Sequence, residues 1–126
     1  KFSILLKIFS ILQSKNYEKL LEHRAQVYKS LGNYKNIAEK VKKLVQEEWK
    51  NTKIYLFGSI LKGKYTGASD IDILIVSDEK IAKEEEYRIK AKIYKNINAP
   101  IELHITTQKE YENWYKKFVK EEIVEV

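Results

Sequence analysis

The sequence contains no cysteine and no methionine, one proline and two histidines. The absence of cysteine excludes a disulfide scaffold, thiolate chemistry and a cysteine-ligated zinc site, and it fits a reducing cytoplasm. Two histidines leave little room for a histidine-rich metal site. The single proline, Pro100, marks no linker, and 126 residues suffice for one domain with one core. We therefore expect one cytoplasmic domain over residues 1–126.

The first twelve residues, KFSILLKIFSIL, are unusually apolar. A membrane span needs about 20 residues, and Lys7 interrupts this run, so we expect no membrane contact. No convincing small-residue cleavage site follows, which argues against a signal peptide. We expect the segment to pack on the core or on a second subunit, which makes a homodimer the default.

The formal net charge is +6, and lysine carries almost all of the positive charge. An excess of positive charge favours polyanionic partners such as nucleotides or nucleic acid, whereas a lysine-rich surface also serves solubility. No RNA-binding motif is visible, so nucleic-acid binding stays open.

Apolar residues recur at helical spacing in two segments of the first half of the chain. The first, residues 17–31, ends before a glycine-asparagine stop signal. The second, residues 34–49, has a cleaner apolar stripe with lysine and glutamate opposite. We predict a core-facing helix in each, and we divide the chain into an N-terminal helical extension (1–33) and a core (34–126).

The apolar period then changes to that of strands. Residues 53–57 (KIYLF) and 70–77 (DIDILIVS) predict two strands, the second apolar on both faces apart from its acids, as in the interior of a sheet. A charged stretch over residues 81–97 carries isoleucines four residues apart and predicts a surface helix. Residues 100–106 (PIELHIT) predict a third strand, and residues 109–119 (KEYENWYKKFV) a final helix with an aromatic stripe.

Two aspartates lie one residue apart at the start of the second predicted strand, where burying charge is costly. Because alternate residues of a strand face one side, Asp70 and Asp72 face the side of Leu74. Glu102 and His104 share a face of the third strand by the same rule, although a structural role for this histidine outweighs a catalytic one. If the two strands are neighbours, three carboxylates converge as in a two-metal site for phosphoryl transfer.

A turn that suits phosphate lies between the first two predicted strands. Gly58 lets the backbone approach a phosphate, and Ser59 is placed to cap a short helix, SILKGKY, whose N-terminus offers free N–H groups. Lys62 lies one turn further and can reach the same phosphates. Gly63 keeps the following loop close, and Ser69 can orient the first aspartate through a hydrogen bond. We therefore predict that these five residues bind a nucleotide.

Three features of this region carry a family resemblance. They are a Gly-Ser pair, two aspartates beginning after ten further residues, and a glutamate between apolar neighbours: Gly58-Ser59, Asp70-Ile71-Asp72, and Glu102 with Ile101 and Leu103. The pattern resembles the DNA polymerase beta-like nucleotidyltransferase superfamily, and the short chain looks like its minimal nucleotidyltransferases. The resemblance runs from about Tyr34 to the C-terminus. It implies an α/β (α+β) fold with a short mixed central sheet flanked by helices.

The resemblance also implies roles for these residues. The three acids would be catalytic and would bind the metal ions, Mg²⁺ or Mn²⁺: Asp70, Asp72 and Glu102. Gly58 and Ser59 would bind the phosphates of a nucleoside triphosphate, with ATP as the first candidate. Members of the superfamily transfer a nucleoside monophosphate to an acceptor hydroxyl and release pyrophosphate. The chain would then be a metal-dependent nucleotidyltransferase.

The chain departs from many relatives at two places. Ile60 and Lys62 stand where those relatives carry arginine, and lysine supplies charge without a bidentate fork. The third acid is a glutamate in place of an aspartate, which moves the carboxylate by about one bond length. Phosphate binding and the position of the third acid are therefore the features in which this chain differs.

Two other functions stay open on the sequence. Minimal nucleotidyltransferases resemble the antitoxin halves of two-gene toxin modules, in which the domain binds, and in some cases nucleotidylates, a helical toxin partner. A degenerate nucleotide-binding scaffold is a third reading, against which the intact acids argue. The acceptor, the base preference and the oligomeric state lie beyond the sequence.

Overall fold

A computed structural model describes residues 19–22, 25, 31–63, 70–115 and 123–126 of the chain, with Ser59, Lys62, Trp114 and Tyr115 described in their backbone only. Helix α3 covers Tyr34–Gln46 and is followed by strand β1 (Lys53–Phe57) and a 3₁₀ turn, η1 (Ser59–Lys62). Strand β2 (Ile71–Ser77), helix α4 (Lys83–Asn96) and strand β3 (Ile101–Thr107) follow. A short helix α5 (Gln108–Glu110), a π-helical turn η2 (Tyr111–Tyr115) and strand β4 (Ile123–Glu125) complete the order.

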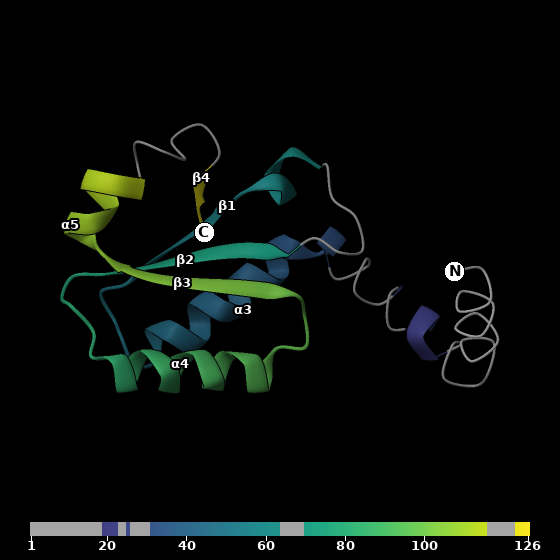
Figure 1. Cartoon of the computed structure of the whole chain (residues 1–126), viewed down its shortest axis with the longest axis horizontal. Helices are drawn as coiled ribbons and strands as arrows, with labels where there is room; N and C mark the ends of the chain where they lie inside the picture. Colours follow the sequence, from purple (N-terminus) through teal and green to yellow (C-terminus); the bar gives the residue numbers. More distant parts are fainter. Residues whose placement is uncertain (1–18, 23–24, 26–30, 64–69, 116–122) are drawn as a thin grey trace, which may run out of the picture.

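The four strands form one mixed sheet in the order β3-β2-β1-β4 (Figure 1). Strands β2 and β3 run parallel, while β1 is antiparallel to both β2 and β4. A parallel pair needs a long crossover, and the 14-residue helix α4 supplies it. The predicted α/β fold with a short mixed sheet and flanking helices is therefore confirmed.

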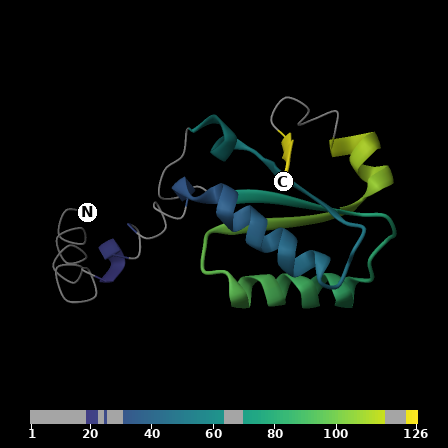
Figure 2. The ribbon, with the colours of Figure 1, turned by 180° about the vertical axis from the view of Figure 1, so that it is seen from behind.

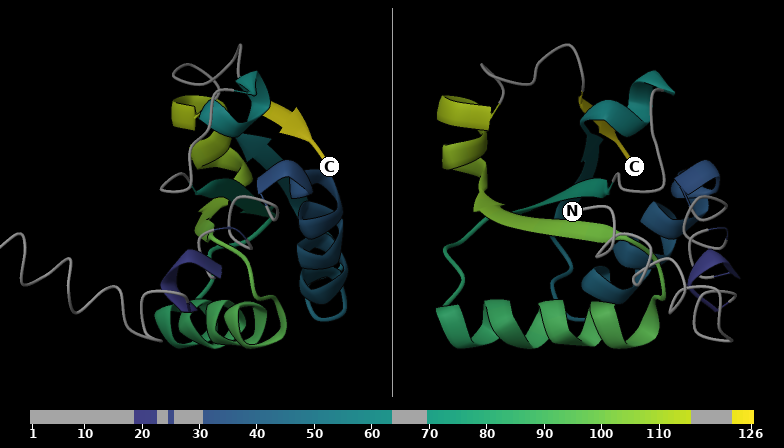
Figure 3. Two further views of the ribbon diagram at one scale, coloured as in Figure 1. Left: turned by 90° about the vertical axis from the view of Figure 1, so that its right-hand side faces the viewer. Right: turned by 45° about the vertical axis from the view of Figure 1, so that its right-hand side comes forward.

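Helices α3 and α4 both pack on one face of the sheet, where they enclose the main apolar core (Figures 1 and 3). The predicted stripe of α3 provides Ile37, Ala38, Val41 and Val45 to this core, and all four are buried. Of the isoleucines four residues apart, Ile89 and Ile93 provide the buried side of α4. Seen from behind in Figure 2, α3 crosses in front of the sheet with α4 beneath it.

The opposite face of the sheet carries a much smaller apolar cluster. Tyr55, Leu74 and Val76 are buried there, with Phe57 and Tyr111 packed against them. The rings of Tyr55 and Tyr111 stack at a centroid distance of 4.8 Å and an interplanar angle of 18°. Tyr111 of η2, the turn that follows α5, covers the Tyr55 end of this face. Polar side chains occupy the other end, near the first residues of β2 and β3.

The three predicted strands and the helices predicted over residues 34–49 and 81–97 agree with the structure in place and type, with differences at their ends. The helix predicted over residues 17–31 lies mostly outside the described residues. The predicted final helix over residues 109–119 is described only up to Tyr115, as α5 and the π-helical turn η2. Strand β4 was not predicted, because three residues are too few for a recognisable period.

Little of the predicted N-terminal extension falls within the described residues. Residues 19–22, 25 and 31–32 are helical, whereas the apolar residues 1–12 lie outside the description. Leu31 is fully buried and belongs to the main core, so the core begins before the predicted boundary at residue 33. Among the described residues, no helix is both long and apolar enough to span a membrane.

Candidate active site

The register of the sheet places two of the predicted acids side by side on the face opposite α3 and α4. Phe57 of β1 is paired with Asp72 of β2, and Asp72 is paired with Glu102 of β3. Directly paired residues project from the same face, so a row of Phe57, Asp72 and Glu102 crosses three strands. The hydrogen bond from the Ile71 N–H to the Pro100 carbonyl, at 2.7 Å, aligns the starts of β2 and β3.

Ionisation of the Asp72 carboxyl group is costly, because the group is partly buried and lies beside Glu102. Burial raises the pKa of the Asp72 carboxyl to about 6, and its hydrogen bond with Glu102 and the like charges of Glu102 and Asp70 add to this rise. The Asp72 side chain is 24% exposed and that of Glu102 is 55% exposed. A positive ion between these groups would relieve the repulsion, because it favours the ionised form of each carboxyl group.

His104 joins the same group from the next outward-facing position of β3. Its Nε2 lies 3.9 Å from Asp72 Oδ1 and 3.7 Å from Glu102 Oε1. Its ring packs against Phe57 with a centroid distance of 5.3 Å and an interplanar angle of 57°. The alternation of β3 had already put His104 on the face of Glu102. The alternation does not show that His104 also lies close to Asp72 of the neighbouring strand.

Asp70 stands slightly apart from this group. It precedes the first residue of β2 and is exposed, although its charge is near enough to help raise the pKa of Asp72. Among the described residues, the cluster whose ligand atoms all lie within 4.8 Å of one another consists of Asp72, Glu102 and His104. The sequence predicts that Asp70 and Asp72 point from the same strand face, whereas in the structure Asp70 precedes β2 and the cluster contains His104 in its place.

The turn after β1 lies directly against Asp72. Gly58 has φ +88°, and a Cβ atom built on it would lie 2.5 Å from Asp72 Oδ2, so a larger residue would collide with the carboxylate. Gly58 itself is the N-cap of η1, and Ser59 is the first residue of that turn. The prediction that Ser59 is the N-cap was wrong, because the chain already changes direction at the left-handed glycine.

The other predicted phosphate-binding residues are placed only in part. Lys62 is the last residue of η1, and Gly63 follows it as a left-handed cap with φ +68°. Ser69 lies outside the described residues. Ile60, which stands where the resemblance leads one to expect arginine, is 1% exposed and belongs to the main core. A charge at position 60 would therefore be buried here, which explains the apolar residue.

The residues present fit a divalent cation. Two carboxylates and one imidazole from adjacent strands can each direct one ligand atom to a common point. Carboxylate oxygens suit Mg²⁺ and Mn²⁺, and imidazole nitrogen suits transition metals. Asp72 would be the central ligand, because it has Glu102 and His104 on one side and the Gly58 turn on the other.

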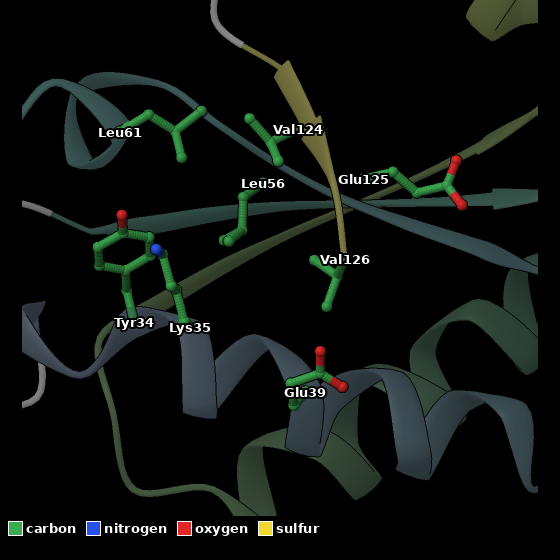
Figure 4. Close-up of a pocket in the computed structure, with 8 residues that line it drawn as sticks. All are labelled: Tyr34, Lys35, Glu39, Leu56, Leu61, Val124, Glu125 and Val126. Carbon is green, nitrogen blue, oxygen red and sulfur yellow. The ribbon is translucent and has the colours of Figure 1, made fainter.

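A separate pocket of about 440 Å³ opens on the other side of the sheet (Figure 4). It lies between α3 and the β1–β4 edge and is lined by residues that include Tyr34, Leu56 and Val124. Leu56 faces the main core, opposite to the face of Asp72. This pocket is therefore distinct from the acidic cluster.

Comparison with known proteins defines the class of the chain. The nucleotidyltransferase domain family matches residues 38–125, which is well over half of the chain, and the chain belongs to this family. The match begins inside α3 and ends in β4, so it includes the whole sheet and every acid discussed above. The predicted superfamily and the enzyme class, a nucleotidyltransferase, are thus confirmed.

Two individual proteins are similar to this chain over most of its length. Over 99 residues, 78% of this chain, the sequence is 31% identical to a protein of Methanocaldococcus jannaschii named "Putative protein adenylyltransferase MJ1379", of which the match covers 99%. A second protein of that organism, "Putative protein adenylyltransferase MJ0126", is 30% identical over 96 residues, 76% of this chain and 97% of that protein.

Solved structures agree on the fold. A crystal structure described as that of a putative nucleotidyltransferase has a TM-score of 0.56 and 31% sequence identity, and the match covers 70% of this chain and 95% of that one. A nucleotidyltransferase of Sulfolobus solfataricus, likewise described as putative, matches with a TM-score of 0.50 and 22% identity over 81% of each chain.

Proposed function

We propose that the chain is a metal-dependent adenylyltransferase that transfers AMP from ATP to a hydroxyl group of another protein and releases pyrophosphate. The observation that carries the proposal is the pairing of Asp72 with Glu102 under the Gly58 turn. The family supports nucleotidyl transfer, and the names of the relatives from Methanocaldococcus jannaschii support AMP and a protein acceptor.

The residues divide the work according to their positions. Asp72 and Asp70 would hold Mg²⁺ or Mn²⁺ with Glu102, and the bound cation would neutralise charge on the triphosphate. Gly58 and Ser59 would offer backbone N–H groups to the phosphates, because the glycine leaves no side chain in the way. Lys62, at the end of the same turn, would add positive charge.

Glu102 is the group best placed to receive the proton of the acceptor. Its side chain is more than half exposed, unlike that of Asp72, so a hydroxyl group from another molecule can reach it. The acceptor oxygen would form the bond to the α-phosphorus as the bond to pyrophosphate breaks, and the hydroxyl proton would pass to the carboxylate. Gly63 would keep the following loop near the nucleotide, and Ser69 would orient Asp70 through a hydrogen bond.

Labelling with ATP tests this proposal. The protein is incubated with cell extract, Mg²⁺ and ATP labelled at the α-phosphate, and in parallel with ATP labelled at the γ-phosphate. We expect a protease-sensitive labelled band only with the α-label, and we expect the double variant Asp70→Asn/Asp72→Asn to lower labelling by at least about 100-fold. Asp78→Asn is the matched control, because Asp78 is an exposed acid beyond the other end of β2.

Equal labelling by the double variant and the wild type would contradict the proposal. The size of the labelled protein, and whether its gene neighbours that of this chain, would test the predicted helical toxin partner. The homodimer, the cytoplasmic location and the absence of membrane contact remain predictions from the sequence.

A further inference from the structure

His104 has no role in the proposed reaction, yet it lies within the acidic cluster. The Nε2 atom is separated from one oxygen of each neighbouring acid by 3.7 and 3.9 Å. Both distances are too long for hydrogen bonds, so the nitrogen lies close to two carboxylates without a hydrogen bond to either. Both separations lie between the distances of about 3.0 Å and about 4.2 Å that adjacent and opposite ligands of an octahedral ion have at metal–ligand distances of about 2.1 Å. One ion can therefore lie between the imidazole nitrogen and these carboxylate oxygens.

The ring is also held in place and accessible. His104 lies in the middle of β3 and pairs with the buried Leu74, so its backbone is part of the rigid sheet. Phe57 packs against the imidazole from β1, two strands away. The side chain is 32% exposed, which leaves a route for an ion from solvent. A ligand that is already positioned by packing loses little freedom when it binds a metal.

We propose that His104 is a ligand of the same cation as Asp72 and Glu102, and that this nitrogen donor makes the site bind Mn²⁺ more tightly than Mg²⁺. The inference rests on the proposed function, since it assigns one more ligand to the metal site of that reaction. Mg²⁺ is held almost entirely by oxygen ligands, whereas a transition-metal ion gains from an imidazole. A site with one nitrogen among its donors therefore discriminates between the two ions.

Electron spin-echo spectroscopy of bound Mn²⁺ tests the inference directly, because a coordinated imidazole nitrogen modulates the echo. The full chain is loaded with Mn²⁺ and tripolyphosphate, which mimics the phosphates of a nucleotide but contains no nitrogen. We expect a ¹⁴N modulation in the wild type, its loss in His104→Gln, and its persistence in His23→Gln, a matched control that removes the other histidine of the chain.

Labelling the histidines with ¹⁵N provides a second test that needs no variant. The modulation of the wild-type protein should change from the ¹⁴N to the ¹⁵N pattern. Bound Mn²⁺ without any imidazole signal would overturn the inference and leave the proposed function standing. Failure of both Mn²⁺ and Mg²⁺ to bind, with or without tripolyphosphate, would overturn the metal dependence of the proposed function as well.

The metal preference provides an independent measurement. Titration calorimetry should give a lower dissociation constant for Mn²⁺ than for Mg²⁺ in the wild type. His104→Gln should weaken Mn²⁺ binding by at least about tenfold and change Mg²⁺ binding much less. An equal loss for both ions, or no loss for either, would contradict a nitrogen ligand, and a melting curve of the variant would establish that it is folded.

Discussion

The two faces of strand β2 differ in what they pack against. Its odd-numbered residues, Ile71, Ile73 and Ile75, lie in the large core under α3 and α4. On the other face, Leu74 and Val76 belong to the small aromatic cluster, and Asp72 begins the polar site. A strand buried on one side by two helices can present a costly acid on its other side, because the core supplies the stability that the acid removes.

The largest effect on the free energy of unfolding should come from truncating one buried side chain on each face of β2. Ile73→Ala and Leu74→Ala change adjacent residues that are both fully buried, one on each face. We expect Ile73→Ala to lower the free energy of unfolding by about 3–5 kcal/mol and Leu74→Ala by about 2–3 kcal/mol, because the smaller cluster can close more of the cavity. Denaturant unfolding measures both values. Equal losses would mean that the two faces contribute equally.

The contact between the Gly58 turn and Asp72 should have the next largest effect. Gly58→Ala places a Cβ atom against the Asp72 carboxylate and forces alanine into a positive φ, so we expect a loss of about 1–3 kcal/mol together with weaker ATP binding. Gly63→Ala is the matched control for stability, since its φ is +68° but its Cβ atom would meet nothing within 4 Å. It should cost less, about 1 kcal/mol. A larger loss at Gly63 would contradict the close contact.

The free-energy cost of ionising Asp72 on the polar face should appear in the pH dependence of the unfolding free energy. The pKa of Asp72 is raised from 3.8 to about 6 in the metal-free protein, so ionisation of Asp72 removes stability as the pH rises from about 4 through about 6. Asp72→Asn should therefore raise the unfolding free energy above pH 6, by about 1 kcal/mol after allowing for solvent screening, and leave it unchanged below pH 4.

Thermal melts of the wild type and the variant across this pH range, in the presence of a chelator, measure the difference. Adding Mn²⁺ should reverse the order, because only the wild type gains stability by binding the ion. Asp78→Asn is the control and should shift the free energy by less than about 0.5 kcal/mol. A variant less stable than the wild type at pH 8 without metal would contradict the assigned cost.

The smallest effect is expected on the outer side of the helical layer. The Glu48 carboxylate accepts hydrogen bonds from Arg88 and Lys92 of α4. These hydrogen bonds lower the pKa of the Glu48 carboxyl to about 2. The stabilisation is present above about pH 4.5 and disappears as the pH falls towards 2. Glu48→Gln should cost less than about 1 kcal/mol at pH 7, because surface ion pairs are weak. A loss of several kcal/mol would show that this layer depends on charge.

Most of the fold follows from local patterns. The helical stripe of α3, the isoleucines of α4 and the alternation of β2 and β3 each have a period that a short window contains. Strand β4 has no such period, because it is too short, and it depends on its pairing with β1, so it could not be predicted. The aromatic stripe predicts a helix over the residues of η2 but not its π-helical form, which accompanies the stacking of Tyr111 over Tyr55.

The candidate site divides in the same way. Alternation along each strand was enough to place Asp72 on the face of Leu74 and Glu102 on the face of His104. The position of Asp70 outside β2 and the contact of Gly58 with Asp72 depend on where the strand begins and how the turn folds back. The burial of Ile60 likewise depends on the core beneath η1.

The sequence by itself determined which residues are acidic, which of them share a strand face, and that a glycine precedes them at a turn. Only the tertiary structure decided that β2 and β3 are parallel neighbours with Asp72 opposite Glu102, and that His104 completes the cluster in front of Phe57. The physical reason is that strand alternation is a property of the local backbone. The register between strands comes from the α4 crossover and from the burial of the isoleucine face, which involve residues distant in the chain.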